Sequence, residues 1–316
     1  MFKKKLVALL GGAMALSLLA AQPVFAQSTQ PTRTDATGAT IPSESPSSGR
    51  LSRGQRQQRR EPAGPTPEAN KAAAQAALTA AGLACQVTEA NLLGVTADQS
   101  SMYEAACAAG PGYMVVNSTP PQTFNCLELA SQAEANRARD PAAEVGQQCA
   151  LPANQNAVAV TAAYARDAGI DCTVDQGSVI GRLEGNIVYE VGCAGADGFQ
   201  IEQKSTGWSK APCWARAMEG AACRYTTPDE NLTAWKTVLA GTEAAACSVQ
   251  QARKVGADAE GRVVYEVKCA PDSGYFVRVN RDTFTASLVH PCAAAAHIGG
   301  GCTLSTFAPA AATSEQ

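Results

Sequence analysis

The sequence predicts an α+β fold of three tandem repeats, each with one helix packed on a small antiparallel three-stranded sheet and stapled by two disulfides. The first observation behind this prediction is a repeated phrase, Tyr-Glu-x-x-Cys, followed five residues after the Cys by Gly and then Tyr or Phe. The three copies begin at Tyr103, Tyr189 and Tyr265. The second observation is that the twelve cysteines divide into four per copy. A fixed spacing that recurs at similar intervals indicates three copies of one structural unit.

The N-terminus has the pattern of a secretory signal peptide over residues 1–26. Lys3–Lys5 are positively charged, Leu6–Ala21 are apolar, and small residues precede the expected cleavage site. An uncleaved membrane anchor is the alternative, but the apolar run is shorter than the roughly 20 residues of a span, and Gln22 and Pro23 interrupt it. We therefore expect no transmembrane anchor after cleavage, and the short Lys-rich leader indicates a bacterial protein that is periplasmic or secreted.

Residues 27–66 and 306–316 are predicted to be disordered because they carry almost no large apolar side chain that could offset the entropy of ordering. Within the first of these segments, residues 50–60 contain five arginines and no acidic residue. They form either a solvated linker or a tether to an anionic envelope polymer. These arginines are Arg50, Arg53, Arg56, Arg59 and Arg60. Nucleic acid is not an expected partner, because the net charge is −3 and no recognition motif is present.

Each predicted repeat begins with an Ala-rich helix. The alanines would let the helix lie close to a sheet, and Gly82 and Gly169 mark the ends of the first two helices. The third helix is less regular, since Gly241 interrupts it. We place the repeats at 67–151, 152–226 and 227–305, and their helices at 68–81, 156–168 and 231–246.

A β-hairpin and a third strand follow each helix. In the second repeat, one strand opens at Cys172, the turn lies at Glu184–Asn186, and Ile187–Cys193 returns. The Gly of the repeated phrase then leads into a third strand, such as Tyr275–Val279. The remaining two cysteines of each repeat close a loop, which is longest in the first repeat.

The cysteines are predicted to be structural disulfides, because an even number in an exported chain of small units is typical of a disulfide framework. The spacings of zinc sites and of Cys-x-x-Cys redox sites are absent. Since the first two cysteines lie at the open ends of one hairpin, we expect first-to-second and third-to-fourth pairing. First-to-fourth with second-to-third pairing is the alternative. The four cysteines of the successive repeats are Cys85, Cys107, Cys126 and Cys149; Cys172, Cys193, Cys213 and Cys223; and Cys247, Cys269, Cys292 and Cys302.

Strand periodicity assigns the repeated phrase to two faces of the sheet, because residues i and i+2 share a side. Tyr189, Val191 and the following cysteine should face the core beneath the helix. The glutamates of the phrase, Glu104, Glu190 and Glu266, should point to the opposite face. That face is predicted to be either solvated surface or a contact surface for a partner, with one acid per repeat.

No catalytic constellation is evident in the sequence, and we expect no cofactor and no metal site. Signatures of serine hydrolases, zinc peptidases and phosphate-binding loops are missing. His290 and His297 lie near the last two cysteines and superficially resemble a metal cluster. The equivalent loop of the second repeat has its cysteines without a histidine, which favours a structural role for the cysteines. Trp208 and Trp214 are candidate surface anchors, and Trp235 is equally suited to a surface or to the core.

Over residues 67–305 the repeated phrase resembles exported bacterial proteins built from cysteine-bearing units, a group without an assigned activity. The order of one helix and antiparallel strands is also loosely similar to PepSY-type and β-lactamase-inhibitor-type modules, which bind proteins. We therefore expect an exported, non-catalytic interaction or scaffold module of the bacterial cell envelope, whose partner is a protein or an anionic polymer. The alternative is an envelope hydrolase or metal-dependent enzyme that uses His290 and His297.

Overall fold

A computed structural model describes residues 64–295, 297–298 and 300–305. These residues belong to one compact unit, Glu61–Gln316. The predicted signal peptide, the Arg-rich linker up to residue 63 and the whole predicted C-terminal tail lie outside the described residues. Among the helices that are described, none combines the length and the apolar character needed to cross a membrane.

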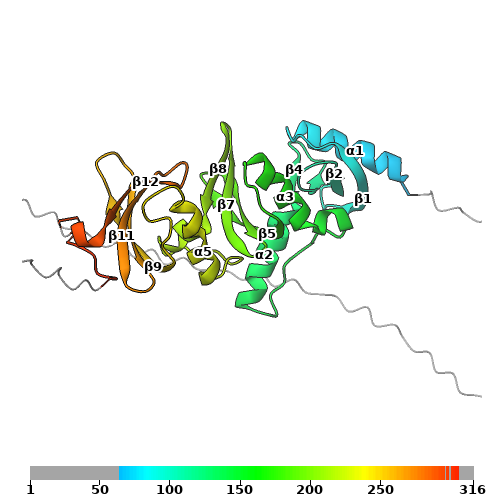
Figure 1. The fold of residues 1–316 in the computed structure, drawn as a ribbon. Coiled ribbons are helices and arrows are strands. Elements are labelled where there is room, and N and C mark those ends of the chain that lie inside the picture. The colour runs from blue at the N-terminus through cyan, green and yellow to red at the C-terminus, as the bar shows by residue number, and fades with distance from the viewer. Residues whose placement is uncertain (1–63, 296, 299, 306–316) are drawn as a thin grey trace, which may run out of the picture. The chain divides into compact units, whose positions relative to one another are not determined.

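The described residues form an α+β structure with three antiparallel sheets, each containing one copy of the repeated phrase (Figure 1). Within each sheet the strand order follows the chain order. The strands are β1 Val87–Val95, β2 Ser101–Cys107, β3 Tyr113–Val116 and β4 Gln122–Asn125; β5 Val174–Leu183, β6 Asn186–Cys193, β7 Ala196–Lys204 and β8 Gly207–Pro212; and β9 Val249–Ala257, β10 Val263–Cys269, β11 Ser273–Val279 and β12 Ala286–Pro291.

The prediction of three strands per sheet is wrong, because each sheet has a fourth. The fourth strands β4, β8 and β12 lie at the sheet edge and run directly into the third cysteine of their repeat. β8 and β12 end in proline, which is tolerated at an edge, where no neighbouring strand requires its missing N–H. These strands are short and have mixed polarity, so their sequences lack the alternation that identifies a half-buried strand.

The helices are α1 Pro67–Ala80, α2 Cys126–Arg139, α3 Ala157–Asp167, α4 Cys213–Ala217 and α5 Pro228–Val238, with 3₁₀ turns η1 Pro152–Gln155 and η2 Cys292–Ala294. Thr66 caps α1, and Thr227 forms a capping box with Glu230 at the start of α5. The predicted continuation of the third helix to residue 246 is wrong. The helix ends at Val238, and Gly241 adopts a left-handed φ of 75° shortly afterwards.

The tyrosine of the repeated phrase lies in the core of every repeat, as predicted. Tyr103, Tyr189 and Tyr265 are all buried, and each packs with apolar side chains of the helix that precedes its sheet. In the first repeat the helix contributes Ala74 and Ala77, whose small side chains allow α1 to lie close to the strands.

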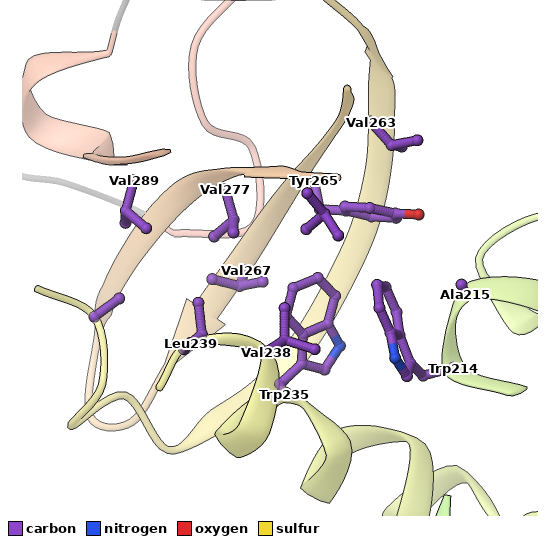
Figure 2. Close-up of a cluster of buried hydrophobic side chains, with 12 residues drawn as sticks. Trp214, Ala215, Trp235, Val238, Leu239, Val263, Tyr265, Val267, Val277 and Val289 are labelled. Atoms are coloured by element: carbon purple, nitrogen blue, oxygen red, sulfur yellow. The ribbon is translucent and has the colours of Figure 1, made fainter. Parts of the chain in front are cut away.

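The side chain that follows the third cysteine connects one repeat with the next. Leu127 of α2 belongs to the core of the second repeat, and Trp214 of α4 belongs to the core of the third. Figure 2 shows the Trp214 indole beside Trp235 of α5, and their ring centroids are 4.7 Å apart. Trp214 is therefore a core residue, and its interpretation as a surface anchor is wrong. At the equivalent position of the third repeat, Ala293 is exposed.

All twelve cysteines are paired, and the predicted first-to-second and third-to-fourth connectivity is confirmed. One disulfide of each repeat joins the ends of the first hairpin, and the other closes the segment after the fourth strand. The pairs are Cys85–Cys107, Cys126–Cys149, Cys172–Cys193, Cys213–Cys223, Cys247–Cys269 and Cys292–Cys302.

Candidate binding groove

The three glutamates of the repeated phrase are buried, so their prediction as contacts on an open face is wrong. Glu104, Glu190 and Glu266 are 1%, 3% and 0% exposed. The segment between the third and fourth cysteines, together with the residues just after it, returns over their face of the sheet. A buried carboxylate requires hydrogen bonds, and this returning segment supplies them.

Glu104 accepts hydrogen bonds from two consecutive backbone N–H groups that follow the fourth cysteine of its repeat. The Ala150 and Leu151 nitrogens each lie 2.8 Å from Oε1, and the side-chain amide of Asn154 also donates at 2.8 Å. These donors are separated from Glu104 by more than forty positions in sequence. The carboxylate therefore fixes the returning segment to the middle of the sheet.

The other two repeats have the same arrangement. Glu266 accepts from the backbone nitrogens of Thr303 and Leu304 at 2.7 and 2.6 Å, and Arg253 donates at 2.6 Å. Glu190 accepts from the backbone nitrogen of Tyr225 at 2.7 Å. Burial raises the pKa of Glu190, and the backbone N–H groups of the returning segment oppose that shift.

The repeated glycine permits this return. A Cβ atom on Gly112, Gly198 or Gly274 would lie 2.6, 2.5 or 2.9 Å from the backbone oxygen of the neighbouring strand β2, β6 or β10. It would also collide with a polar side chain from beyond the fourth cysteine. The glycine is therefore needed for close approach of two chain segments. Since glutamate, glycine and disulfides occur in all three repeats, they explain the architecture and do not mark a site specific to one repeat.

One feature is specific to the first repeat. The segment between its third and fourth cysteines spans 23 positions, against 10 in each of the other two repeats. The additional residues form most of α2, which begins at an Asn125 cap. This helix packs against strand β5 of the second repeat (Figure 1). The insertion thus builds a helix beside the edge of a neighbouring sheet.

A groove with a cavity volume of about 600 Å³ lies between α2 and β5. Its helical wall consists of one face of α2, and its other wall consists of five consecutive residues of β5 and the side chain of Arg224. The α2 residues are Glu128, Ser131, Gln132, Glu134, Ala135 and Ala138, and the β5 residues are Ser178, Val179, Ile180, Gly181 and Arg182. The lining is predominantly apolar. An apolar groove with a few polar groups is the usual form of a binding site.

The strand wall of the groove is a sheet edge. Among the described residues β5 pairs with β6 alone, so the backbone groups on its other side have no strand partner. The pairing register shifts between Val179 and Gly181, which leaves Ile180 as a β-bulge residue. The Ile180 side chain is 43% exposed. The groove therefore offers free main-chain groups next to an exposed apolar side chain.

Two ion pairs join the repeats at this groove. Arg182 donates to both carboxylate oxygens of Glu128, with an Nη2–Oε2 distance of 2.7 Å, and Arg224 pairs with Glu134. The hydrogen bond from Arg224 lowers the pKa of the Glu134 carboxyl. Two arginines and two glutamates leave this lining without a net charge. Exposed pairs of this kind contribute little stability, so their main effect is to set the polarity and position of the walls.

The two histidines do not form a cluster with other ligating side chains in the described part of the chain. His290 is half-buried on β12, and His297 is exposed in the segment that follows η2. Two groups do bring a carboxylate near two cysteines, namely Glu104 with Cys126 and Cys149, and Glu266 with Cys292 and Cys302. In both groups the sulfur atoms form a disulfide and the carboxylate is occupied by N–H donors. These groups therefore do not offer metal ligands in the oxidised protein.

The groove was not apparent from the sequence. Two signals could have indicated it: the longer segment between Cys126 and Cys149, and the Gly that follows each bulge at Gly94, Gly181 and Gly256. The first marks the insertion, and the second marks the place where the first strand of each sheet bends. The predicted tether arginines, from Arg50 to Arg60, lie outside the described residues.

Comparisons of the chain with protein-family models, with curated proteins and with solved structures gave no match. The interpretation of function therefore depends on the groove and on the chemistry of its walls.

Proposed function

We propose that this protein is an exported, non-catalytic interaction module of the cell envelope, and that the groove between α2 and β5 binds an extended segment of a partner protein. The observation that carries the proposal is that the edge strand β5 has a free side next to helix α2. This helix is formed by an insertion that the other two repeats lack. An extended peptide can add to such an edge through main-chain hydrogen bonds, while pockets beside it receive alternate side chains.

The chemistry of the lining favours a polypeptide over an anionic polymer. The paired arginines and glutamates leave the groove without net charge, so it does not attract a polyanion. The unpaired backbone of β5 requires a partner that has both N–H donors and C=O acceptors. The exposed side chain of Ile180 requires an apolar residue opposite it. A peptide in strand conformation satisfies all three conditions.

An extracytoplasmic setting is supported by the six disulfides, because such a framework is typical of proteins in oxidising compartments. The disulfides staple small units that would otherwise have little core to balance the entropy of ordering.

The test begins with a photo-crosslinking amino acid at Gln132 in the groove, in cells that produce the full chain. A crosslinker at Leu288, an exposed residue of β12 in the third repeat, is the control. We expect Gln132 to yield a discrete crosslinked protein whose attached peptide can be identified by mass spectrometry. The same crosslinked product from both positions, or none from Gln132, would contradict the proposal.

The identified segment is then synthesised and titrated against the purified protein. Replacing Ile180 with Lys should weaken binding at least about tenfold, because it places a charge where an apolar side chain is expected. Leu288→Lys is the matched control, since Leu288 is 41% exposed against 43% for Ile180. Two peptides methylated at every second backbone nitrogen, offset from each other by one residue, test strand addition. Binding should be abolished in the peptide whose methylated nitrogens face β5 and retained in the other.

A further inference from the structure

Asp197 occupies a position that distinguishes the second repeat from the other two. It precedes the repeated glycine at the start of β7, where the first repeat has Pro111 and the third has Ser273. Only the second repeat therefore places a carboxylate directly before the repeated glycine. Asp197 takes no part in the hydrogen bonds of the three buried glutamates, and it does not line the groove between α2 and β5.

The two oxygens of Asp197 have different surroundings. Oδ1 accepts a hydrogen bond from the backbone nitrogen of Trp214 at 3.0 Å. Oδ2 is buried and has no hydrogen-bond partner among the described residues. A buried oxygen without a partner is costly for a neutral group and more so for a charged one. The site is therefore better suited to a neutral carboxyl group than to a carboxylate.

Trp214 extends from the second repeat into the third. Its side chain is 2% exposed and packs within the core of the third repeat. Its ring centroid lies 4.7 Å from that of Trp235 and 5.3 Å from that of Tyr265 (Figure 2). Asp197 thus accepts a hydrogen bond from the backbone of Trp214, the residue whose side chain inserts from the second repeat into the core of the third.

The charged groups around Asp197 do not favour its ionised form. From α5, Glu230 acts through space as a like charge. From α4, the Arg216 guanidinium is engaged by Gln200 and Glu219. The turn that carries Asp197 contributes no other charged residue. Burial raises the pKa of Asp197 from 3.8 to about 7, with the backbone N–H groups of Trp214 and Cys213 opposing the shift and Glu230 adding to it.

We propose that Asp197 makes the junction between the second and third repeats sensitive to pH near neutrality: the neutral carboxyl is accommodated in its buried site beside Trp214, whereas ionisation buries a charge with one oxygen unpartnered and destabilises the junction despite a stronger hydrogen bond from the Trp214 N–H. The direction follows from proton linkage. A carboxyl group whose pKa is raised by folding binds its proton more tightly in the folded state than in the unfolded state. The stability that it contributes is fully present below its ordinary pKa of 3.8 and is lost as the pH rises through about 7.

The experiment measures hydrogen exchange of the Trp214 amide and tryptophan fluorescence of the full chain between about pH 5 and pH 9. In the wild type, we expect the protection factor of the Trp214 amide to fall at least about tenfold from pH 6 to pH 8, with a red shift of the emission. Asp197→Asn should remove this pH dependence. Asp272→Asn is the matched control, because Asp272 lies in the equivalent turn of the third repeat and is 70% exposed; it should behave as the wild type.

A wild type whose Trp214 protection does not change over this range would overturn the proposal. So would a pH response that Asp197→Asn leaves intact. If Asp197→Asn does not fold, carboxyl-carbon NMR of the wild type gives a direct test. A titration midpoint for the Asp197 carboxyl carbon between about pH 6 and pH 8 supports the proposal, and a midpoint below about pH 5 refutes it.

Discussion

Replacing Glu104 with Gln should release the segment that returns over the first sheet. Glutamine keeps the shape of the side chain and removes its charge. Its oxygen can take the place of Oε1, which accepts from Ala150, Leu151 and Asn154. Its NH₂ group then stands where Oε2 now accepts from Ala150 at 2.9 Å. The three remaining hydrogen bonds become neutral, and the second contact with Ala150 becomes repulsive.

The size of the effect follows from these contacts. A hydrogen bond to a charged group contributes about 1.5–3 kcal/mol and a neutral one about 1 kcal/mol, so neutralising three bonds loses about 3 kcal/mol. Glutamine also avoids part of the cost of burying a charge, which offsets about 1 kcal/mol of that loss. The net expectation is about 2 kcal/mol, or roughly a 30-fold change in the local opening equilibrium.

Hydrogen exchange of the Ala150 and Leu151 amides measures this directly, since these two groups are the donors. We expect both to exchange about 30-fold faster in Glu104→Gln than in the wild type. Glu89→Gln is the control, because Glu89 lies on the neighbouring strand β1 and is exposed. If exchange in Glu104→Gln stays within threefold of the wild type, or matches that of Glu89→Gln, the carboxylate does not hold the segment and the reasoning fails.

Three further changes test other parts of the structure. Trp214→Ala should destabilise the third repeat by about 3–5 kcal/mol, measured by urea unfolding, because it empties a buried aromatic position; the half-buried Trp208→Ala should cost clearly less. Gly274→Ala should lower the melting temperature strongly, since its Cβ would lie 2.9 Å from a backbone oxygen, whereas Gly256→Ala has no atom within 4 Å and should change it little. Because burial raises the pKa of Glu190, its contribution to stability should decline as the pH rises above about 4.5; Glu190→Gln should flatten that part of the wild-type profile of urea midpoint against pH.

Local pattern was sufficient to predict the hairpin at the centre of each repeat. The turn at Glu184 and Gly185 needs two left-handed residues, and the φ angles are 50° and 90°. The alternation of Tyr189 and Val191 assigned the core face, because a side-chain period of two does not depend on distant residues. The same hairpin brought Cys172 close to Cys193 and so determined the disulfide pairing.

Long-range contacts account for what the sequence did not reveal. Period-two alternation correctly separated Glu104 from the core tyrosine, but it could not show that Ala150 and Leu151 would return to cover the opposite face. Trp214 was misinterpreted for a similar reason, since its binding site is made by residues of the next repeat. The groove was missed for the same reason, since it exists only where α2, the insertion of the first repeat, meets β5, the edge strand of the second.

The exposed alanine after Cys292 bears on how many units this architecture can hold. A chain that grows by inserting a large apolar side chain into the neighbouring core needs such a side chain at every junction. Leu127 and Trp214 supply it at the two junctions that the structure describes, and Ala293 offers a single methyl group in their place. At this position the last repeat therefore lacks the counterpart of Leu127 and Trp214 that could insert into a fourth unit or into the first repeat of another copy. Open-ended head-to-tail association, a hazard for repeated units with complementary ends, is thereby disfavoured at this end of the array.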